Sequence, residues 1–147
     1  MKIKSGIYEK GTISLEKIIA EIRQHPHIEQ AGDLITFTGI VRGETPKGEK
    51  VIKIKIEAYP EQADKVLRTI SDELRNTKGI IEVIIAHLVG EFLRGEDMVY
   101  VVIAGAHRDE SFNTLIQAVN RYKQEAPLWK KEFLESGVSY WVEEPAH

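Results

Sequence analysis

Apolar and polar positions alternate along the chain with two different periods, and each period predicts a different element. Residues 51–59, VIKIKIEAY, repeat at every second position, which is the side-chain period of a strand with one buried face. The inward positions are expected to be Ile52, Ile54 and Ile56, and the outward ones Lys53, Lys55 and Glu57. A sheet with one wet face favours antiparallel pairing.

Five more segments have the apolar or alternating character of strands. They are residues 2–8 at a sheet edge, 33–42, 80–92, 98–106 and 138–144. A turn around residues 94–97 joins the two most apolar runs. The segment GETPKGEK, residues 43–50, is polar with two glycines and a proline, and we expect it to be the most mobile loop.

Helical spacing of apolar residues appears in three long segments and one short one. Residues 14–24 begin at Ser14, a suitable N-cap, residues 60–79 end at Gly79, and residues 110–126 end before Pro127. Residues 128–136 are expected to add a short helix. The first two apolar stripes are Leu15, Ile18, Ile19 and Ile22, and Ala63, Val66, Leu67, Ile70 and Leu74.

The order of these elements predicts the fold class. Consecutive strands with no helix between them argue against a doubly wound parallel sheet. We therefore expect an α+β fold, with the helices packed on one side of a mostly antiparallel or mixed sheet. The chain has 147 residues, a length that suits one domain with a real core, so residues 1–147 are taken as a single domain.

Composition narrows the possible functions. The formal net charge is −3, which provides no overall attraction to nucleic acid or to acidic membranes. The chain contains no cysteine, so any sulfur chemistry needs sulfur from outside the chain. The N-terminus lacks an apolar signal segment, and no apolar run reaches about 18 residues. We expect a cytoplasmic protein that binds neither membrane nor nucleic acid.

The stretch AGAHRDESF, residues 104–112, places His107 and Arg108 where a buried strand leads into a helix. Free backbone N–H groups at a helix start favour an anion. An arginine adds a bidentate fork for phosphate or carboxylate, and a histidine adds a titratable donor. Asp109 is expected to cap the helix. The alternative is a solvated arginine and a hydrogen-bonded histidine in an ordinary turn.

The helix that follows contains a lysine in an apolar setting. Its expected apolar stripe is Phe112, Leu115, Ile116 and Val119. Lys123 lies four residues after Val119 and seven after Ile116, so it continues this stripe. Its amine either extends past the helix end to solvent or lies in a pocket, where partial burial would suit it to proton transfer or to nucleophilic work.

Five cationic side chains lie at the ends of predicted elements, where loops build sites. They are Arg42, His107, Arg108, Lys123 and Lys130. A small, multiply charged anion is the ligand that fits them, and neighbouring subunits are needed if one chain cannot bring them together. His87 lies in an apolar strand and is taken as a hydrogen-bonded core histidine. His25 and His27 lack a third ligand at a usual spacing, so no metal is predicted.

Four motifs in order give the chain a resemblance to a known family. GDLITFTGIVRG, EAYPEQA, AGAHRDESF and YKQEAPLWKKE resemble those of the large, catalytic subunit of molybdopterin synthase, over about residues 32–141. The resemblance implies an α/β hammerhead-type fold that forms a homodimer. It implies no cofactor and a small ubiquitin-like partner, whose C-terminal Gly-Gly thiocarboxylate supplies sulfur. The implied substrate is cyclic pyranopterin monophosphate, and the product is molybdopterin.

The resemblance also implies roles for individual residues. Lys123 and Lys130 match the two active-site lysines. The positions that match substrate-binding residues are Arg42, His107 and Arg108. The positions near the partner's tail channel are Phe37, Pro127, Leu128 and Trp129. The acidic end of the chain, residues 142–147, lacks the basic residues that some members add to a neighbour's site.

Two other functions use the same cations. One is a non-enzymatic module that binds a phosphorylated metabolite, which would not need Lys123 on the apolar face of its helix. The other is a scaffold whose lysines only dock a ubiquitin-like partner.

Overall fold

The structure is a computed structural model that describes residues 2–142. Its helices are α1 (Leu15–Ile22), α2 (Pro60–Arg75) and α3 (Arg108–Glu125), with a short 3-10 turn at Ile28–Gln30. Its strands are β1 (Gly6–Glu9), β2 (Asp33–Ile40), β3 (Val51–Ala58), β4 (Ile80–Leu93), β5 (Asp97–Gly105), β6 (Leu128–Leu134) and β7 (Ser139–Trp141). The predicted α+β class is confirmed.

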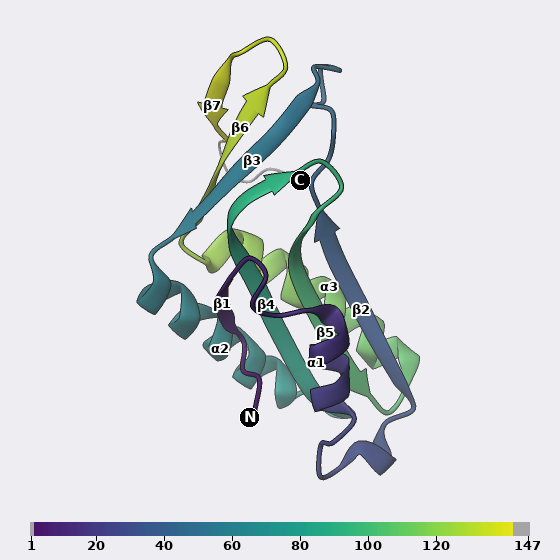
Figure 1. The fold of residues 1–147 in the computed structure, drawn as a ribbon. Coiled ribbons are helices and arrows are strands. Elements are labelled where there is room, and N and C mark those ends of the chain that lie inside the picture. The colour runs from purple at the N-terminus through teal and green to yellow at the C-terminus, as the bar shows by residue number, and fades with distance from the viewer. Residues whose placement is uncertain (1, 143–147) are drawn as a thin grey trace.

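The long strand β4 joins two parts of one sheet. The order is β2-β5-β4-β3-β6-β7, and every pair along this path is antiparallel. One edge of β4 pairs with β5 over the first part of the strand. The opposite edge of β4 pairs first with β1, in parallel, and then with β3. The change of partner falls at Gly90, whose φ of 129° favours glycine. Strands β3, β6 and β7 extend as an arm above the main sheet (Figure 1).

Helices cover both faces of the main sheet, not one as predicted. Helices α2 and α3 pack on one face, where Leu67, Ile70 and Ala118 meet Val101. Helix α1 packs on the opposite face, and its Ile18 belongs to a second apolar cluster (Figure 1). The second layer exists because β4 and β5 are apolar on both sides, so both faces need a cover. The Ser14 side chain caps α1 as predicted.

Two local predictions were wrong for reasons of strand pairing. Residues 128–134 form β6, not a helix, because they pair along β3 from Ala58 back to Val51. Ile52 is exposed by 40%, since a register irregularity at Val51–Lys53 turns Val51 inward in its place. The predicted final strand is confirmed at Ser139–Trp141, and residues 143–147, including most of the acidic end, lie outside the described residues.

Helix α3 buries only part of the face expected: Leu115 and Val119 pack against the core cluster beside α2. Its buried residues are Ser111, Thr114, Ala118 and Tyr122, whereas Phe112 and Ile116 are 50% and 58% exposed. Small side chains let the helix approach the sheet closely: a Cβ on Gly105 would collide with the Ser111 hydroxyl. Tertiary packing therefore selects the small residues for burial. The N-cap residue is His107, not Asp109, and Asp109 lies in the first turn.

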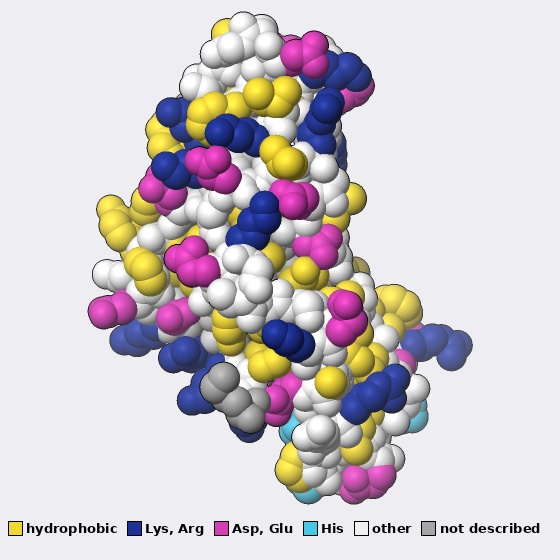
Figure 2. Space-filling model, in the orientation of Figure 1, with side chains coloured by type: hydrophobic (Ala, Val, Ile, Leu, Met, Phe, Trp, Pro, Cys, Tyr) yellow, Lys and Arg dark blue, Asp and Glu magenta, His cyan; other side chains and the backbone are white. Residues whose placement is uncertain are grey.

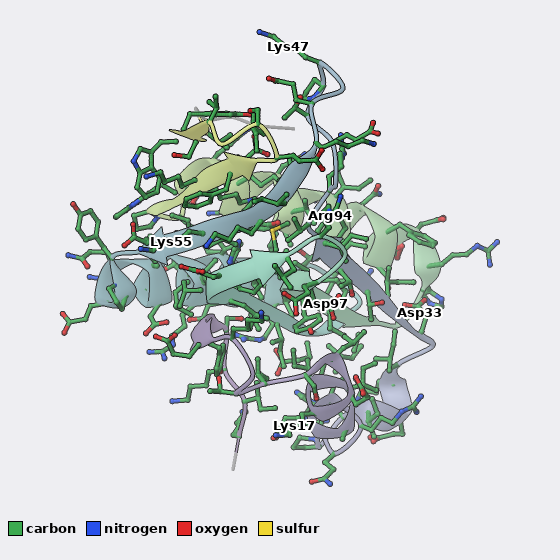
Figure 3. All side chains as sticks on the ribbon, turned by 45° about the horizontal axis from the view of Figure 1, so that its top comes forward. Lys17, Asp33, Lys47, Lys55, Arg94 and Asp97 are labelled. Carbon is green, nitrogen blue, oxygen red and sulfur yellow. The ribbon has the colours of Figure 1, made fainter. Side chains whose placement is uncertain are left out.

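The loop predicted to be mobile, residues 43–50, is folded into a hydrogen-bonded turn. The Thr45 N–H donates to the Glu49 carbonyl at 2.9 Å, and Lys50 pairs with Glu44 at 2.7 Å between Nζ and Oε1. Lys47 lies at its tip and points away from the body (Figure 3). Cationic and acidic side chains are interspersed over the face in Figure 2. No helix within residues 2–142 is long and apolar enough to cross a membrane.

Candidate functional site

The two lysines from the sequence motifs lie where α3 ends and β6 begins. Lys123 belongs to the last turn of α3 and is half-buried. The helix ends at Ala126, whose backbone is extended, because Pro127 follows and disfavours a helical residue before it. The chain then enters β6, which carries the half-buried Lys130. The break in the chain at Pro127 thus leaves both lysines near the C-terminal end of α3.

Strand alternation separates Lys130 from its neighbour Lys131, because successive side chains point to opposite faces. The Lys131 ammonium lies 5.4 Å from the ring centre of Phe133 and 5.5 Å from that of Trp141. Lys53 lies over the same Phe133 ring at 4.8 Å. Lys131 therefore belongs to a surface cluster of aromatic and cationic side chains, whereas Lys130 points to the opposite face of β6, which Leu128 and Leu134 share.

A buried histidine lies at this site. His87 on β4 is 1% exposed, and its ring packs edge-on against Tyr122 of α3, with ring centres 5.5 Å apart. Burial, and then the positive charges of Lys130 and Lys123, lower the pKa of His87 from 6.5 to about 3. The charges of both lysines thus converge on one neutral imidazole. A polar residue inside an apolar strand was the sequence signal for this role.

Aromatic and apolar side chains surround the lysine end of α3. Phe37 of β2 packs on the same core cluster as Tyr122. Trp129 stacks edge-on against Tyr59, with ring centres 4.9 Å apart, and the Pro127 carbonyl accepts a hydrogen bond from the Tyr59 N–H at 3.3 Å. Leu128 packs instead on the core cluster of the opposite sheet face, so its side chain serves the core.

Arg42 follows β2 and is exposed beside the turn between β4 and β5. The turn is fixed by two backbone bonds, from the Val41 N–H to the Glu96 carbonyl and from the Gly95 N–H to the Val41 carbonyl. The Arg42 guanidinium has no hydrogen bond or ion pair with a described residue. Arg42 is therefore a free cation just beyond the strand that carries Phe37.

His107 and Arg108 lie at the other end of α3. Fifteen residues separate Arg108 from Lys123, which corresponds to about 22 Å along a helix. Both side chains are exposed and unpaired among the described residues. A hollow of about 220 Å³ adjoins this end and is lined by His25, His27, Gln30, Gly79, Ile80, Ile81 and Ala106. One chain therefore cannot bring all five cations together.

Two further observations bound what the site can hold. A larger hollow of about 340 Å³ lies along α2 between residues 61 and 69, and none of the predicted site residues lines it. Within residues 2–142, no three His, Asp or Glu side chains are grouped so as to hold a metal ion. The candidate cations are thus divided between the two ends of α3, with Lys123 at its C-terminal end and His107 and Arg108 at its N-terminal end.

The fold is α+β, and the candidate site has Lys123 and Lys130 at the C-terminal end of α3, where their charges act on the buried His87. The MoaE protein family model matches residues 8–125. A molybdopterin synthase catalytic subunit from Pyrococcus abyssi is 35% identical over 116 residues, which cover 79% of this chain and 77% of that one. Another curated relative is longer, and the chain spans 50% of it. The chain belongs to the MoaE family, as its motifs implied.

Solved structures agree with this assignment. The crystal structure of molybdopterin synthase from Staphylococcus aureus superposes with a TM-score of 0.84 at 30% identity, covering 98% of this chain and 100% of that one. A complex of subunits 1 and 2 of the molybdopterin-converting factor from Helicobacter pylori has a TM-score of 0.74 at 18% identity, covering 97% and 92%. The second likeness concerns the fold alone.

Proposed function

We propose that this chain is the catalytic subunit of a molybdopterin synthase. It would transfer sulfur from the thiocarboxylated C-terminus of a small ubiquitin-like subunit to cyclic pyranopterin monophosphate, in the cytoplasm and without a cofactor of its own. The observation that carries the proposal is the placement of Lys123 and Lys130 where α3 ends and β6 begins, in a family whose relatives include molybdopterin synthase catalytic subunits.

The charges of the reactants explain why lysines are needed. A thiocarboxylate is an anion, and the substrate carries a phosphate, so the two reactants repel each other unless cations lie between them. Lys123 and Lys130 supply these cations beside the reacting sulfur. Half-burial of both side chains strengthens their interaction with developing negative charge. The sulfur must come from the partner because the chain contains no cysteine.

The surroundings of the lysines suit a slender peptide tail. A Gly-Gly end has no side chains, so it can pass between closely packed aromatic residues. Phe37 and Trp129 are half-buried aromatic residues, and we assign them, with Pro127, to the wall of the tail channel. Leu128 contributes through its backbone, since its side chain packs in the core.

The substrate's phosphate would be bound by Arg42, His107 and Arg108, and this requires a second copy of the chain. Arg108, Phe112, Ile116 and Lys123 follow one face of α3 at helical spacing, and the two apolar residues between the cations are exposed. A two-fold antiparallel pairing of α3 helices would cover this stripe and place Arg108 of one copy near Lys123 of the other. Strand β2 ends the sheet path and lies beside α3 (Figure 1).

Reconstitution tests the catalytic proposal. The chain is incubated with thiocarboxylated small subunit and cyclic pyranopterin monophosphate, and molybdopterin is detected; the carboxylate form of the small subunit is the control. Product that depends on the thiocarboxylate supports the proposal. Substrate binding without partner binding would instead identify a metabolite-binding module, and partner binding without turnover a scaffold.

Mixed dimers test whether the site is shared between copies. Arg108→Ala and Lys123→Ala chains are each expected to turn over slowly at low substrate concentration, since every site then lacks one of its cations. After random mixing of equal amounts, half of the dimers carry one of each, and about a quarter of all sites are intact in a two-fold dimer. Recovery of activity on mixing supports the shared site, and no recovery in a sample shown to exchange subunits contradicts it.

A further inference from the structure

Tyr59 precedes α2 without stabilising it through its side chain. It is the N-cap residue of the helix, the position where Ser, Thr, Asp or Asn usually binds the free N–H groups through a side-chain oxygen. The Tyr59 side chain makes no such bond. Pro60 follows at the start of the helix, a position for which proline is well suited. The start of α2 therefore does not explain why a tyrosine stands here.

The core does not explain Tyr59 either. Its side chain is 59% exposed, and its hydroxyl makes no hydrogen bond with a described residue. The hydroxyls of Tyr8, Tyr100 and Tyr140, by contrast, each donate to a carbonyl or carboxylate oxygen. A residue that breaks a local preference without a gain in packing is expected to serve function. Tyrosine suits binding, because it joins a large apolar ring to a polar tip.

The segment that joins α3 to β6 holds Tyr59 in place. The Tyr59 N–H donates to the Pro127 carbonyl at 3.3 Å, and its ring packs edge-on against that of Trp129, with ring centres 4.9 Å apart. Trp129 is half-buried and is paired in the sheet with Glu57 of β3. A second, less exposed ring therefore supports the Tyr59 ring, and little side-chain freedom is left to lose on binding. We call Tyr59 and Trp129 the aromatic pair.

The aromatic pair lies beside the segment that carries Lys130. The start of α2 and the start of β6 lie side by side (Figure 1), and Trp129 directly precedes Lys130, about 3.8 Å away between Cα atoms. Successive side chains of β6 take opposite faces, so a tail that contacts both crosses the start of the strand, where Pro127 lies. An extended Gly-Gly end covers about 7 Å. The residues before it are thus the ones that can reach the aromatic pair.

We propose that Tyr59 binds the small subunit, and that its ring forms, with Trp129, the outer part of the tail channel and packs against the residues that precede the Gly-Gly end. A glycine tail has no side chain for a pocket to bind, so the residues before it supply the apolar contacts. Rigid aromatic side chains dominate such contacts in interfaces, and the Tyr59 hydroxyl can donate to a carbonyl of an extended chain. The inference rests on the proposed function, which supplies the partner.

Binding of the small subunit tests this role without sulfur transfer. The carboxylate form of the subunit is titrated into the chain, and its Kd is measured by calorimetry. We expect Tyr59→Ser to raise the Kd about 5- to 30-fold, the range from an ordinary interface residue to a hot spot. The Tm should stay the same or rise, because serine can cap α2. Leu93→Ser is the matched control, since Leu93 is also 59% exposed and lies at the end of β4; the Kd should keep its wild-type value.

Two further measurements separate the ring from the hydroxyl and binding from catalysis. Tyr59→Phe should recover most of the affinity lost in Tyr59→Ser, because the ring stays; a loss as large as in Tyr59→Ser would overturn the packing role. With thiocarboxylated subunit, Tyr59→Ser should raise the KM for the subunit more than it lowers kcat. A fall in kcat at an unchanged KM would contradict a role in binding.

Trp129 reports the contact directly. The chain has two tryptophans, so Trp141→Phe leaves Trp129 as the only one, and its fluorescence should change when a small subunit without tryptophan binds. No change in a complex shown to form would place the tail elsewhere and overturn the inference. A wild-type Kd in Tyr59→Ser, or equal losses in Tyr59→Ser and Leu93→Ser, would overturn it too and leave the proposed function standing. Failure of the wild-type chain to bind the small subunit would instead refute the proposed function.

Discussion

Lys130 and Lys131 are adjacent in the chain, and replacing each with alanine should have opposite consequences. Lys130 lies at the site beside α3, where its charge reaches His87. Lys131 lies over two aromatic rings on the other face of β6. The two substitutions remove the same atoms from the same strand, so each is the control for the other.

The structure sets the expected size of each effect. Lys131→Ala loses two cation–π contacts, each worth about 0.5–1 kcal/mol at an exposed site, so the free energy of unfolding should fall by about 1–2 kcal/mol. In a domain of this size each kcal/mol lowers Tm by roughly 2–4 °C. Lys130→Ala removes one electrostatic stabiliser of the reacting sulfur, which raises the barrier by about 2.7–4 kcal/mol and lowers kcat about 10²- to 10³-fold.

The assay is single-turnover formation of molybdopterin with saturating thiocarboxylated small subunit, paired with thermal unfolding of each variant. We expect Lys131→Ala to keep wild-type turnover with a lower Tm, and Lys130→Ala to lose turnover. Turnover within about threefold of wild type in Lys130→Ala, less than the loss of one catalytic hydrogen-bond donor, would refute the reasoning. An equal loss of turnover in Lys131→Ala would also refute the reasoning, since the face of β6 on which a lysine lies would then not decide whether it takes part in catalysis.

Four more predictions follow from the same geometry. Lys123→Ala should lower turnover about 10²- to 10³-fold and keep partner binding. Lys123→Arg should retain measurable turnover if only the charge matters and lose it if a proton must move. Near wild-type turnover in Lys123→Ala would remove Lys123 from the mechanism. Arg108→Ala should weaken substrate binding by about 1.5–3 kcal/mol with little change in Tm, which calorimetry measures; unchanged affinity would exclude the residue. Ile116→Asp should convert dimers to monomers in sedimentation, because it puts a charge into the exposed apolar stripe of α3; an intact dimer would place the interface elsewhere. The buried, neutral His87 should make the chain less stable in acid, because the unfolded state gains a proton below pH 6.5 and the folded state only near pH 3. The free energy of unfolding should therefore fall by about 1.4 kcal/mol per pH unit between these values, relative to His87→Gln. Parallel curves of stability against pH for the two proteins would contradict this.

Local pattern predicted much of the fold. The alternation and apolar runs located β2, β3, β4 and β5 to within a few residues, and the stripe of α2 was confirmed, with Val66 only half-buried. These elements are long and strongly periodic, so local information suffices for them. The short segment at residues 128–134 was misassigned, because its strand state depends on pairing with β3, which is far away in the sequence.

The candidate site divides in the same way. The sequence by itself determined the MoaE family and the absence of cysteine. It also named the candidate cations Lys123, Lys130, Arg42, His107 and Arg108, because residue types at fixed spacing carry that information. The family resemblance singled out Lys130, whereas the local pattern could not show that Lys130 and Lys131 take opposite faces, since the segment was predicted as a helix and only strand pairing decides the faces.

Only the tertiary structure decided the rest. It packed the core residue His87 of β4 against Tyr122 of α3, a contact that forms only after folding. It left Phe112 and Ile116 of the predicted α3 stripe exposed, because the small residues Ser111, Thr114 and Ala118 pack closer to the sheet. It also set Arg108 about 22 Å from Lys123, since a helix is rigid and keeps its two ends apart.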